Sequence, residues 1–273
     1  MNKKILILGK GFIGERLQKE LSCRIDGTII NNFNDAQKLI NRFKPKILIN
    51  CIGITGKRNV DDCELEKDAT LLANSFVPII LAEVCLRNNI KLVHISSGCI
   101  YEYDYKENKP IKEEDLPNFF GLFYSRSKIY SERALGVLSK KYNILILRIR
   151  IPLLNVPHPK NLLDKLIRYK KVIDVPNSIT YIPDFIKATK YLLSIEARGI
   201  YNMVNKGALK YKDLMNIYKN YIPNFEYKII SLKNLKLVRS NLILSTRKLE
   251  RSGFKVRSIN SVLEECVKEY IKY

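Results

Sequence analysis

The segment Gly9-Lys10-Gly11-Phe12-Ile13-Gly14 follows directly on the apolar run Ile5-Leu6-Ile7-Leu8. The run predicts a buried strand over residues 4–8, and the residues after the loop predict a helix over 12–21. Glycines at these three positions permit a tight turn, close approach of a pyrophosphate to the backbone, and packing of helix on strand. The segment therefore predicts a dinucleotide site formed by Gly9, Lys10, Gly11, Phe12, Ile13 and Gly14.

Strand and helix patterns alternate along the rest of the first half of the chain. We expect strands at residues 46–50, 91–95 and 144–150, separated by helices at 68–88 and 124–141. This alternation is typical of an α/β protein with a doubly wound parallel sheet, the Rossmann fold. We assign residues 1–150 to the dinucleotide-binding domain, with 180–204 returning to it. Residues 151–273 are expected to form mainly a smaller substrate lobe, with helices at 183–195, 211–221 and 258–271 and a strand at 199–204.

The composition excludes several classes of protein. The chain has 46% hydrophobic residues and no apolar run of the roughly 18–20 residues that a membrane span requires, so we expect a cytoplasmic protein without membrane contact. Its net charge is +21, but the lysines are scattered and form no basic helix, which argues against nucleic acid as a partner. Six cysteines without metal-ligand spacing and only two histidines predict no metal site.

The choice between NADP and NAD depends on the second strand. An NAD enzyme often carries an acid at the end of that strand, to bind the ribose 2′-hydroxyl. We place the end near residues 29–32, where there is no acid, while Lys10 can neutralise a 2′-phosphate. NADPH is therefore the expected cofactor, with NADH as the alternative, and Asp35 is expected near the adenine.

Tyr124 and Lys128 lie four residues apart in a predicted helix, so they share a face. A lysine cation favours the phenolate and lowers the tyrosine pKa, which allows the phenol to transfer a proton to a carbonyl oxygen. Ser97 follows a predicted strand, at the edge of the sheet where ligands of α/β proteins bind. The order of glycine loop, serine and YxxxK is that of the short-chain dehydrogenases.

Beyond these motifs, the sequence resembles the bifunctional nucleotide-sugar 3,5-epimerase/4-reductases of the rhamnose synthase type, which are extended short-chain dehydrogenases/reductases. The similarity covers nearly the whole chain in order, in residues 53–61, 97–104, 112–119, 123–128, 147–152, 159–161, 168–169, 176–178, 199–202 and 239–241. The chain departs from this family in its glycine loop, which is one residue shorter than the family's GxxGxxG.

The resemblance implies a role for each matching residue. Ser97, where the family usually has threonine, and Tyr124 would bind the C4 carbonyl, with Tyr124 as the acid. Lys128 would bind the nicotinamide ribose, and Tyr124 would also be part of the cofactor site. Cys99 and Lys165 would be the acid and base on the two faces of the sugar during epimerisation. Substrate-binding roles are implied for Arg58, Asn118, Asn161 and Arg239.

The expected function is thus 3,5-epimerisation and NAD(P)H-dependent 4-keto reduction of UDP- or dTDP-4-keto-6-deoxyglucose, since no motif here distinguishes the two bases. Two alternatives remain, namely a 4-reductase without epimerase activity and a non-catalytic regulatory subunit. Because many relatives dimerise, a homodimer is the expected assembly.

Overall fold

The computed structural model describes residues 2–57, 59–232 and 238–273, and the chain folds as two compact units. Unit 1 comprises Met1–Ile100, Pro117–Arg148 and Leu192–Tyr201, and unit 2 comprises Tyr101–Leu116, Ile149–Tyr191 and Asn202–Tyr273. The segment that returns to the first unit is thus shorter than residues 180–204, and a loop within the first half of the chain belongs to the second unit.

Unit 1 is built on a six-stranded sheet in the order β2-β1-β3-β4-β5-β9. Its strands are β1 (Asn2–Leu8), β2 (Cys23–Asp26), β3 (Ile47–Asn50), β4 (Lys91–Ser97), β5 (Ile144–Ile149) and β9 (Gly199–Asn202). β1 pairs in parallel with both β2 and β3, and β3 pairs in parallel with β4. The chain winds in opposite directions from β1 and β3, so the topological switch point, where α/β proteins bind ligands, lies between these two strands.

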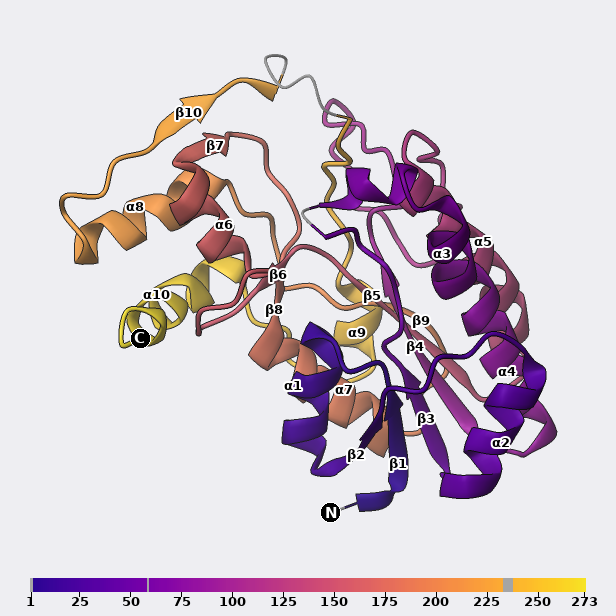
Figure 1. Ribbon diagram of the computed structural model, residues 1–273. Coiled ribbons are helices and arrows are strands. Elements are labelled where there is room, and N and C mark those ends of the chain that lie inside the picture. The colour runs from indigo at the N-terminus through magenta and orange to yellow at the C-terminus, as the bar shows by residue number, and fades with distance from the viewer. Residues whose placement is uncertain (1, 58, 233–237) are drawn as a thin grey trace. The chain divides into compact units, whose positions relative to one another are not determined.

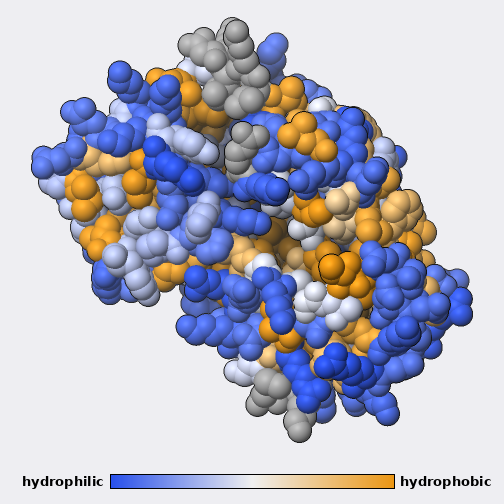
Figure 2. Space-filling model, viewed as in Figure 1, coloured by the Kyte–Doolittle hydropathy of each residue, from blue (hydrophilic) through white to orange (hydrophobic). Residues whose placement is uncertain are grey.

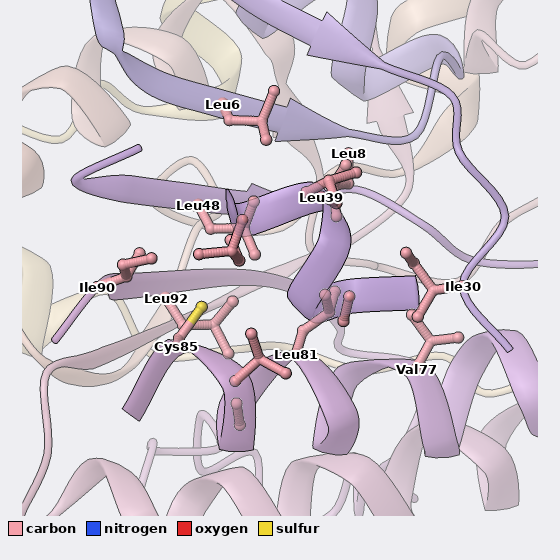
Figure 3. Close-up of a cluster of buried hydrophobic side chains, with 14 of the residues drawn as sticks. Leu6, Leu8, Ile30, Leu39, Leu48, Val77, Leu81, Cys85, Ile90 and Leu92 are labelled. Carbon is pink, nitrogen blue, oxygen red and sulfur yellow. The ribbon is translucent and has the colours of Figure 1, made fainter. Parts of the chain in front are cut away.

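Helices cover both faces of this sheet, which confirms the predicted Rossmann fold. Figure 1 shows α1 on one side and α2, α4 and α5 on the other. The helical segments of unit 1 are α1 (Phe12–Leu21), α2 (Phe33–Phe43), the 3₁₀ helix η1 (Val60–Glu64), α3 (Lys67–Leu71), the π-helical turn η2 (Leu72–Phe76), α4 (Val77–Arg87) and α5 (Phe123–Ser139). Between sheet and helices lies an aliphatic core, which includes Leu8, Leu48 and Leu81 of α4 (Figure 3).

The prediction for the second strand is wrong. β2 ends at Asp26, whereas the adjacent isoleucines at 29 and 30 led us to place the strand end near residues 29–32. Ile30 is buried because it packs in the core after the strand, while Ile29 is 75% exposed. An edge strand of four residues with one fully buried member is too short for its periodicity to be recognised.

Residues Lys67–Arg87 form one helical stretch that is long and apolar enough to cross a membrane by length and composition alone. This finding corrects the expectation that the chain contains no apolar run of that length. The stretch is the central helix of unit 1, and 56% of its most apolar window is buried, with Val77 and Leu81 in the core. Core helices of water-soluble proteins pass the same test, because they too are apolar on most sides.

Unit 2 is smaller in its regular structure and has its own core. It contains two short parallel strand pairs, β6 (Pro152–Leu153) with β8 (Thr180–Tyr181) and β7 (Lys171–Ile173) with β10 (Lys228–Ile230). Its helices are α6 (Leu162–Tyr169), α7 (Ile182–Ser194), α8 (Tyr211–Tyr221), α9 (Arg247–Arg251) and α10 (Ile259–Tyr270). Leu163, Met215 and Val262, which come from three of these helices, are completely buried.

Hydrophilic side chains cover much of one face of the molecule. Figure 2 shows this face, with hydrophobic residues dispersed among the hydrophilic ones.

Candidate active site

The glycine loop has the backbone that a pyrophosphate site requires. Gly9 has φ +100°, a conformation that L side chains rarely adopt, and a Cβ on Gly14 would lie 2.0 Å from the carbonyl oxygen of Gly9. No described atom lies within 4 Å of a Cβ placed on Gly11, which caps α1 without a side-chain hydrogen bond. The N-terminus of the ten-residue helix α1 is therefore open at a glycine, and it fits an anionic group.

The loop also packs against the neighbouring strand end. A Cβ on Gly9 would lie 2.9 Å from the backbone of Cys51 and Ile52, which follow β3. The loops after β1 and β3 thus meet at the topological switch point of the sheet. The position of the dinucleotide at this loop stays a prediction.

An acid stands at the end of the second strand, where none was predicted. The carboxylate of Asp26 accepts a hydrogen bond from the backbone N–H of Thr28 at 2.8 Å. Partial burial opposes its ionisation, but this hydrogen bond and the charges of Arg42 and Lys10 hold the pKa of Asp26 below its usual value. The aliphatic stem of Lys10 lies over Gly27, 3.2 Å from where its Cβ would be. An acid and a cation therefore flank the same strand end.

Asp35 stabilises the start of α2. Its carboxylate accepts from the backbone N–H of Asn31 at 3.1 Å, and its own N–H donates to the side chain of Asn32, the N-cap of α2, at 3.0 Å. Asp35 also lines a surface cavity together with Thr28 and Lys38.

Three of the predicted catalytic residues are buried in unit 1. Ser97 is the last residue of β4, and Tyr124 and Lys128 lie in the first two turns of α5; their exposed fractions are 6%, 5% and 4%. Ser97 Oγ accepts the backbone N–H of Cys99 at 3.1 Å, and Ser125 Oγ donates to the carbonyl of Cys99 at 2.6 Å. These two bonds, both through Cys99, connect the end of β4 to the N-terminus of α5, which carries the YxxxK pair.

The ammonium of Lys128 lies against backbone. A Cβ on Gly53 would be 3.1 Å from Lys128 Nζ and from Asn74 Oδ1, so a side chain at this position would have to displace both groups by a few tenths of an ångström. Burial lowers the pKa of Lys128 to about 8, while the charge of Glu132 has the opposite effect. At neutral pH the lysine is therefore still a cation, next to a tyrosine on the same helix face.

Asn74, which was not predicted from the sequence, lies in the π-helical turn η2. Its side-chain oxygen accepts from the N–H of Ile54 at 2.9 Å, and its amide donates to Ile54 O at 3.0 Å and to Ser127 Oγ at 3.1 Å. It thereby holds the loop after β3 against the helix that carries Lys128. An asparagine within an apolar helix is the signal that was available, since buried amides need partners.

His94 in β4 is a second buried group that was overlooked. The side-chain oxygen of Asn50 accepts from the N–H of Ile52 at 2.9 Å, which leaves its amide to donate to His94 Nδ1 at 3.2 Å. The proton of the neutral imidazole is then on Nε2. Burial and the Lys128 cation keep the pKa of His94 well below its usual value, so the ring is neutral.

The other predicted site residues belong to both units. Asn118, in unit 1, is exposed, and its backbone N–H donates to Ile100 O at 3.2 Å. Arg58 lies outside the described residues. Arg239 in unit 2 is half-buried, and its guanidinium donates to the carbonyl of Val238 at 2.7 Å.

Two more lie on α6 of unit 2. The side chain of Asn161 is completely buried and caps this helix; its oxygen accepts from the N–H of Leu154 at 2.9 Å and its amide donates to the carbonyl of the same residue at 3.0 Å. Lys165 is half-buried, and burial, followed by the charges of Lys160 and Arg168, lowers its pKa. Asn161 thus has a structural task whatever else it does, while the surroundings of Lys165 lower its pKa relative to that of a solvated lysine.

A glycine loop at the switch point, followed by a buried serine and a YxxxK helix, defines a Rossmann enzyme of the extended short-chain dehydrogenase/reductase class. The model of the family described as RmlD substrate binding domain matches residues 3–211. A bifunctional dTDP-4-dehydrorhamnose 3,5-epimerase/dTDP-4-dehydrorhamnose reductase from Arabidopsis thaliana is 34% identical over 97% of this chain and 92% of its own length. The chain belongs to the RmlD family of NAD(P)-dependent reductases.

Other relatives extend this finding. A trifunctional UDP-glucose 4,6-dehydratase/UDP-4-keto-6-deoxy-D-glucose 3,5-epimerase/UDP-4-keto-L-rhamnose-reductase of Arabidopsis thaliana is also 34% identical, but the chain spans only 42% of its length. The crystal structure of the L780 UDP-rhamnose synthase from Acanthamoeba polyphaga mimivirus superposes with a TM-score of 0.89 at 27% identity, covering 97% of this chain and 98% of that one. A dTDP-4-dehydrorhamnose reductase from Bacillus anthracis, solved in complex with NADP, has a TM-score of 0.84 at 22% identity, covering 100% and 99%.

Proposed function

We propose that the chain completes the synthesis of a nucleotide-linked rhamnose, by 3,5-epimerisation and NADPH-dependent 4-keto reduction of UDP- or dTDP-4-keto-6-deoxyglucose. The observation that carries the proposal is the buried Ser97, Tyr124 and Lys128 set in a chain that matches a bifunctional epimerase/reductase over nearly its whole length. In keeping with this function, we infer that the protein works in the cytoplasm on a small-molecule substrate, as a homodimer.

In the reduction, Ser97 and Tyr124 bind the C4 carbonyl oxygen and Tyr124 donates its phenolic proton to that oxygen. NADPH supplies the hydride to C4 when it is bound. The Lys128 cation favours the phenolate that Tyr124 becomes, which makes the proton transfer easier at neutral pH. Its burial strengthens this effect, because a charge acts more strongly where water is excluded.

In the epimerisation, protons are removed from C3 and C5 and returned on the opposite faces of the sugar. Both carbons flank the C4 ketone, so the hydrogen bonds from Ser97 and Tyr124 stabilise the enolate that forms. We assign Cys99 and Lys165 as the acid/base groups for the two faces. Two features support them: Cys99 is held next to Ser97, and the lowered pKa of Lys165 increases its neutral fraction.

The dinucleotide would be held by residues 9–14, with its pyrophosphate at the N-terminus of α1. We assign NADPH as the main cofactor and NADH as a second one, because both an acid and a cation stand at the end of β2. Asp26 is suited to a ribose 2′-hydroxyl, whereas Lys10 is suited to a 2′-phosphate. Asp35 remains assigned to the adenine side, and Arg58, Asn118, Asn161 and Arg239 to the nucleotide-sugar.

Replacing Asp26 by asparagine is expected to shift the preference toward NADPH. The carboxylate repels a 2′-phosphate, so its removal should raise the NADPH-to-NADH affinity ratio about tenfold, equivalent to ~1.4 kcal/mol. Fluorescence titration of the protein with each cofactor measures this ratio without any turnover. Glu20→Gln, another acid of unit 1, is the control and should leave the ratio unchanged. An unchanged ratio in Asp26→Asn as well would remove Asp26 from the cofactor site.

The function is tested by incubating the protein with UDP-4-keto-6-deoxyglucose and NADPH in deuterated water. We expect NADPH absorbance to fall and the product to be a rhamnose nucleotide with deuterium at C3 and C5. If NADPH is oxidised but no deuterium appears at C3 and C5, the protein is a 4-reductase without epimerase activity. A complete lack of oxidation with both nucleotides and both cofactors would instead favour the non-catalytic subunit.

A further inference from the structure

A buried ion pair lies directly behind the catalytic helix face. Glu132 of α5 and Arg148 of β5 have exposed fractions of only 2% and 1%. The carboxylate oxygen Oε1 of Glu132 accepts from Arg148 Nε at 2.9 Å and from Nη2 at 2.7 Å. Its other oxygen, Oε2, accepts from Ser96 Oγ of β4 at 2.5 Å. Both oxygens of this carboxylate are thus used within the protein interior.

The residues of this network lie next to the proposed catalytic residues in β4 and α5. Ser96 immediately precedes Ser97 in β4, and Glu132 follows Lys128 by one turn of α5. The carboxylate therefore joins the strand that ends in Ser97 to the helix that carries Tyr124 and Lys128. Replacement of a buried ion pair by well-packed apolar side chains of the same volume is often neutral for stability or even stabilising. Its presence at this place calls for a role beyond stability.

That role follows from the charges around Lys128. The titratable groups that face it are Tyr124 and Glu132 from its own helix, His94 from β4, and the thiols of Cys51 after β3, Cys63 in η1 and Cys99 after β4. His94 is neutral, and burial raises the pKa values of the Cys51 and Cys63 thiols, which keeps these two protonated at neutral pH. Glu132 is the carboxylate in this set, and it counteracts the effect of burial on the lysine.

We propose that Glu132, oriented by Arg148 and Ser96, is a positioning residue for the reduction, which fixes α5 to the end of β4 and supplies the counter-charge for the ammonium of Lys128. This inference rests on the proposed function, in which Tyr124 and Lys128 carry out proton transfer to the C4 oxygen. It assigns no contact with substrate to Glu132 itself.

The test is Glu132→Gln, which keeps the shape of the side chain and removes its charge. Wild-type kcat should be flat below pH 8 and fall as the pH rises through about 8, because Lys128 then loses its proton. Without the carboxylate, the charged form of Lys128 is less favoured over the neutral form. The falling limb of the profile of kcat against pH should therefore move to lower pH by about one pH unit.

Two further variants separate charge from structure. Arg148→Lys keeps both charges but loses the forked geometry, so it should lower Tm without moving the limb. Glu132→Gln combined with Arg148→Met removes the unpaired buried cation, which should restore Tm while the limb stays below its wild-type position. If kcat falls at the wild-type pH both in Glu132→Gln and in the double variant, whatever their Tm, the proposal is overturned.

A measurement on cofactor-free protein makes the result independent of turnover. The Lys128 side chain can be titrated by NMR after ¹³C labelling of lysine, its signal being identified by its loss in Lys128→Met. In Glu132→Gln it should titrate at lower pH than in wild type. If wild-type protein turns over no keto-sugar, the proposed function fails, but this titration still decides the role of Glu132.

Discussion

Replacement of Tyr124 by phenylalanine should reduce kcat for 4-keto reduction by about 10²–10⁴-fold, the range for removal of a general acid. The ring is 5% exposed in the first turn of α5, and phenylalanine fills the same space. Because only the phenolic proton donor is lost, NADPH binding and the melting temperature should stay close to wild type. The measurement is NADPH oxidation at saturating keto-sugar, together with a fluorescence titration of NADPH.

Tyr130 offers a matched control for this variant. It lies on the same helix but is 48% exposed, so Tyr130→Phe should keep the wild-type kcat. Near-normal turnover in Tyr124→Phe would mean that another group donates the proton, and the assignment of the YxxxK pair would have to be abandoned.

The second large effect is expected from Cys99→Ser. A serine hydroxyl keeps the shape of the thiol but is a far weaker acid, so it cannot transfer protons to and from carbon at neutral pH. Deuterium incorporation at the carbon that Cys99 serves should fall by at least about 10²-fold. Reduction of a substrate that is already epimerised should be nearly unaffected, because Ser97, Tyr124 and Lys128 remain in place.

Cys85→Ser serves as the control for loss of a thiol in unit 1. Cys85 is buried in the core on α4, and burial raises its pKa to about 12, so it takes no part in proton transfer. This variant should lower the melting temperature and leave deuterium exchange unchanged. If Cys99→Ser also exchanges deuterium at the wild-type rate, Cys99 takes no part in the epimerisation.

The fold and much of the proposed catalytic set could be predicted without the structure, because both depend on local patterns. Gly9 and Gly14 are needed for backbone reasons, because side chains at these two positions would collide with neighbouring backbone, whereas the space beside Gly11 is open. The spacing of Tyr124 and Lys128 places them on one helix face wherever the helix lies. The predicted helix over 12–21 was correct to the residue, since α1 begins and ends there.

The less regular segments were not predictable in this way. The pair of isoleucines at 29 and 30 resembled a strand, but β2 is a four-residue edge strand that ends at Asp26. Its length is set by pairing with β1, which no property of residues 23–26 alone reveals. For the same reason the sequence analysis found no acid for the cofactor ribose.

By itself the sequence determined the glycine turn, the helix faces and the order of the motifs, because each depends on residues close together in the chain. Tertiary structure alone decided which buried polar groups are partners. Glu132 looks like any surface glutamate in its helix, but it meets Ser96 and Arg148, which lie 36 and 16 residues away. In the same way Asn74 reaches Ser127, 53 residues further along the chain. Burial determines these partners, because a polar group removed from water needs a hydrogen bond. Only the packing of strands and helices decides which group is close enough to form it.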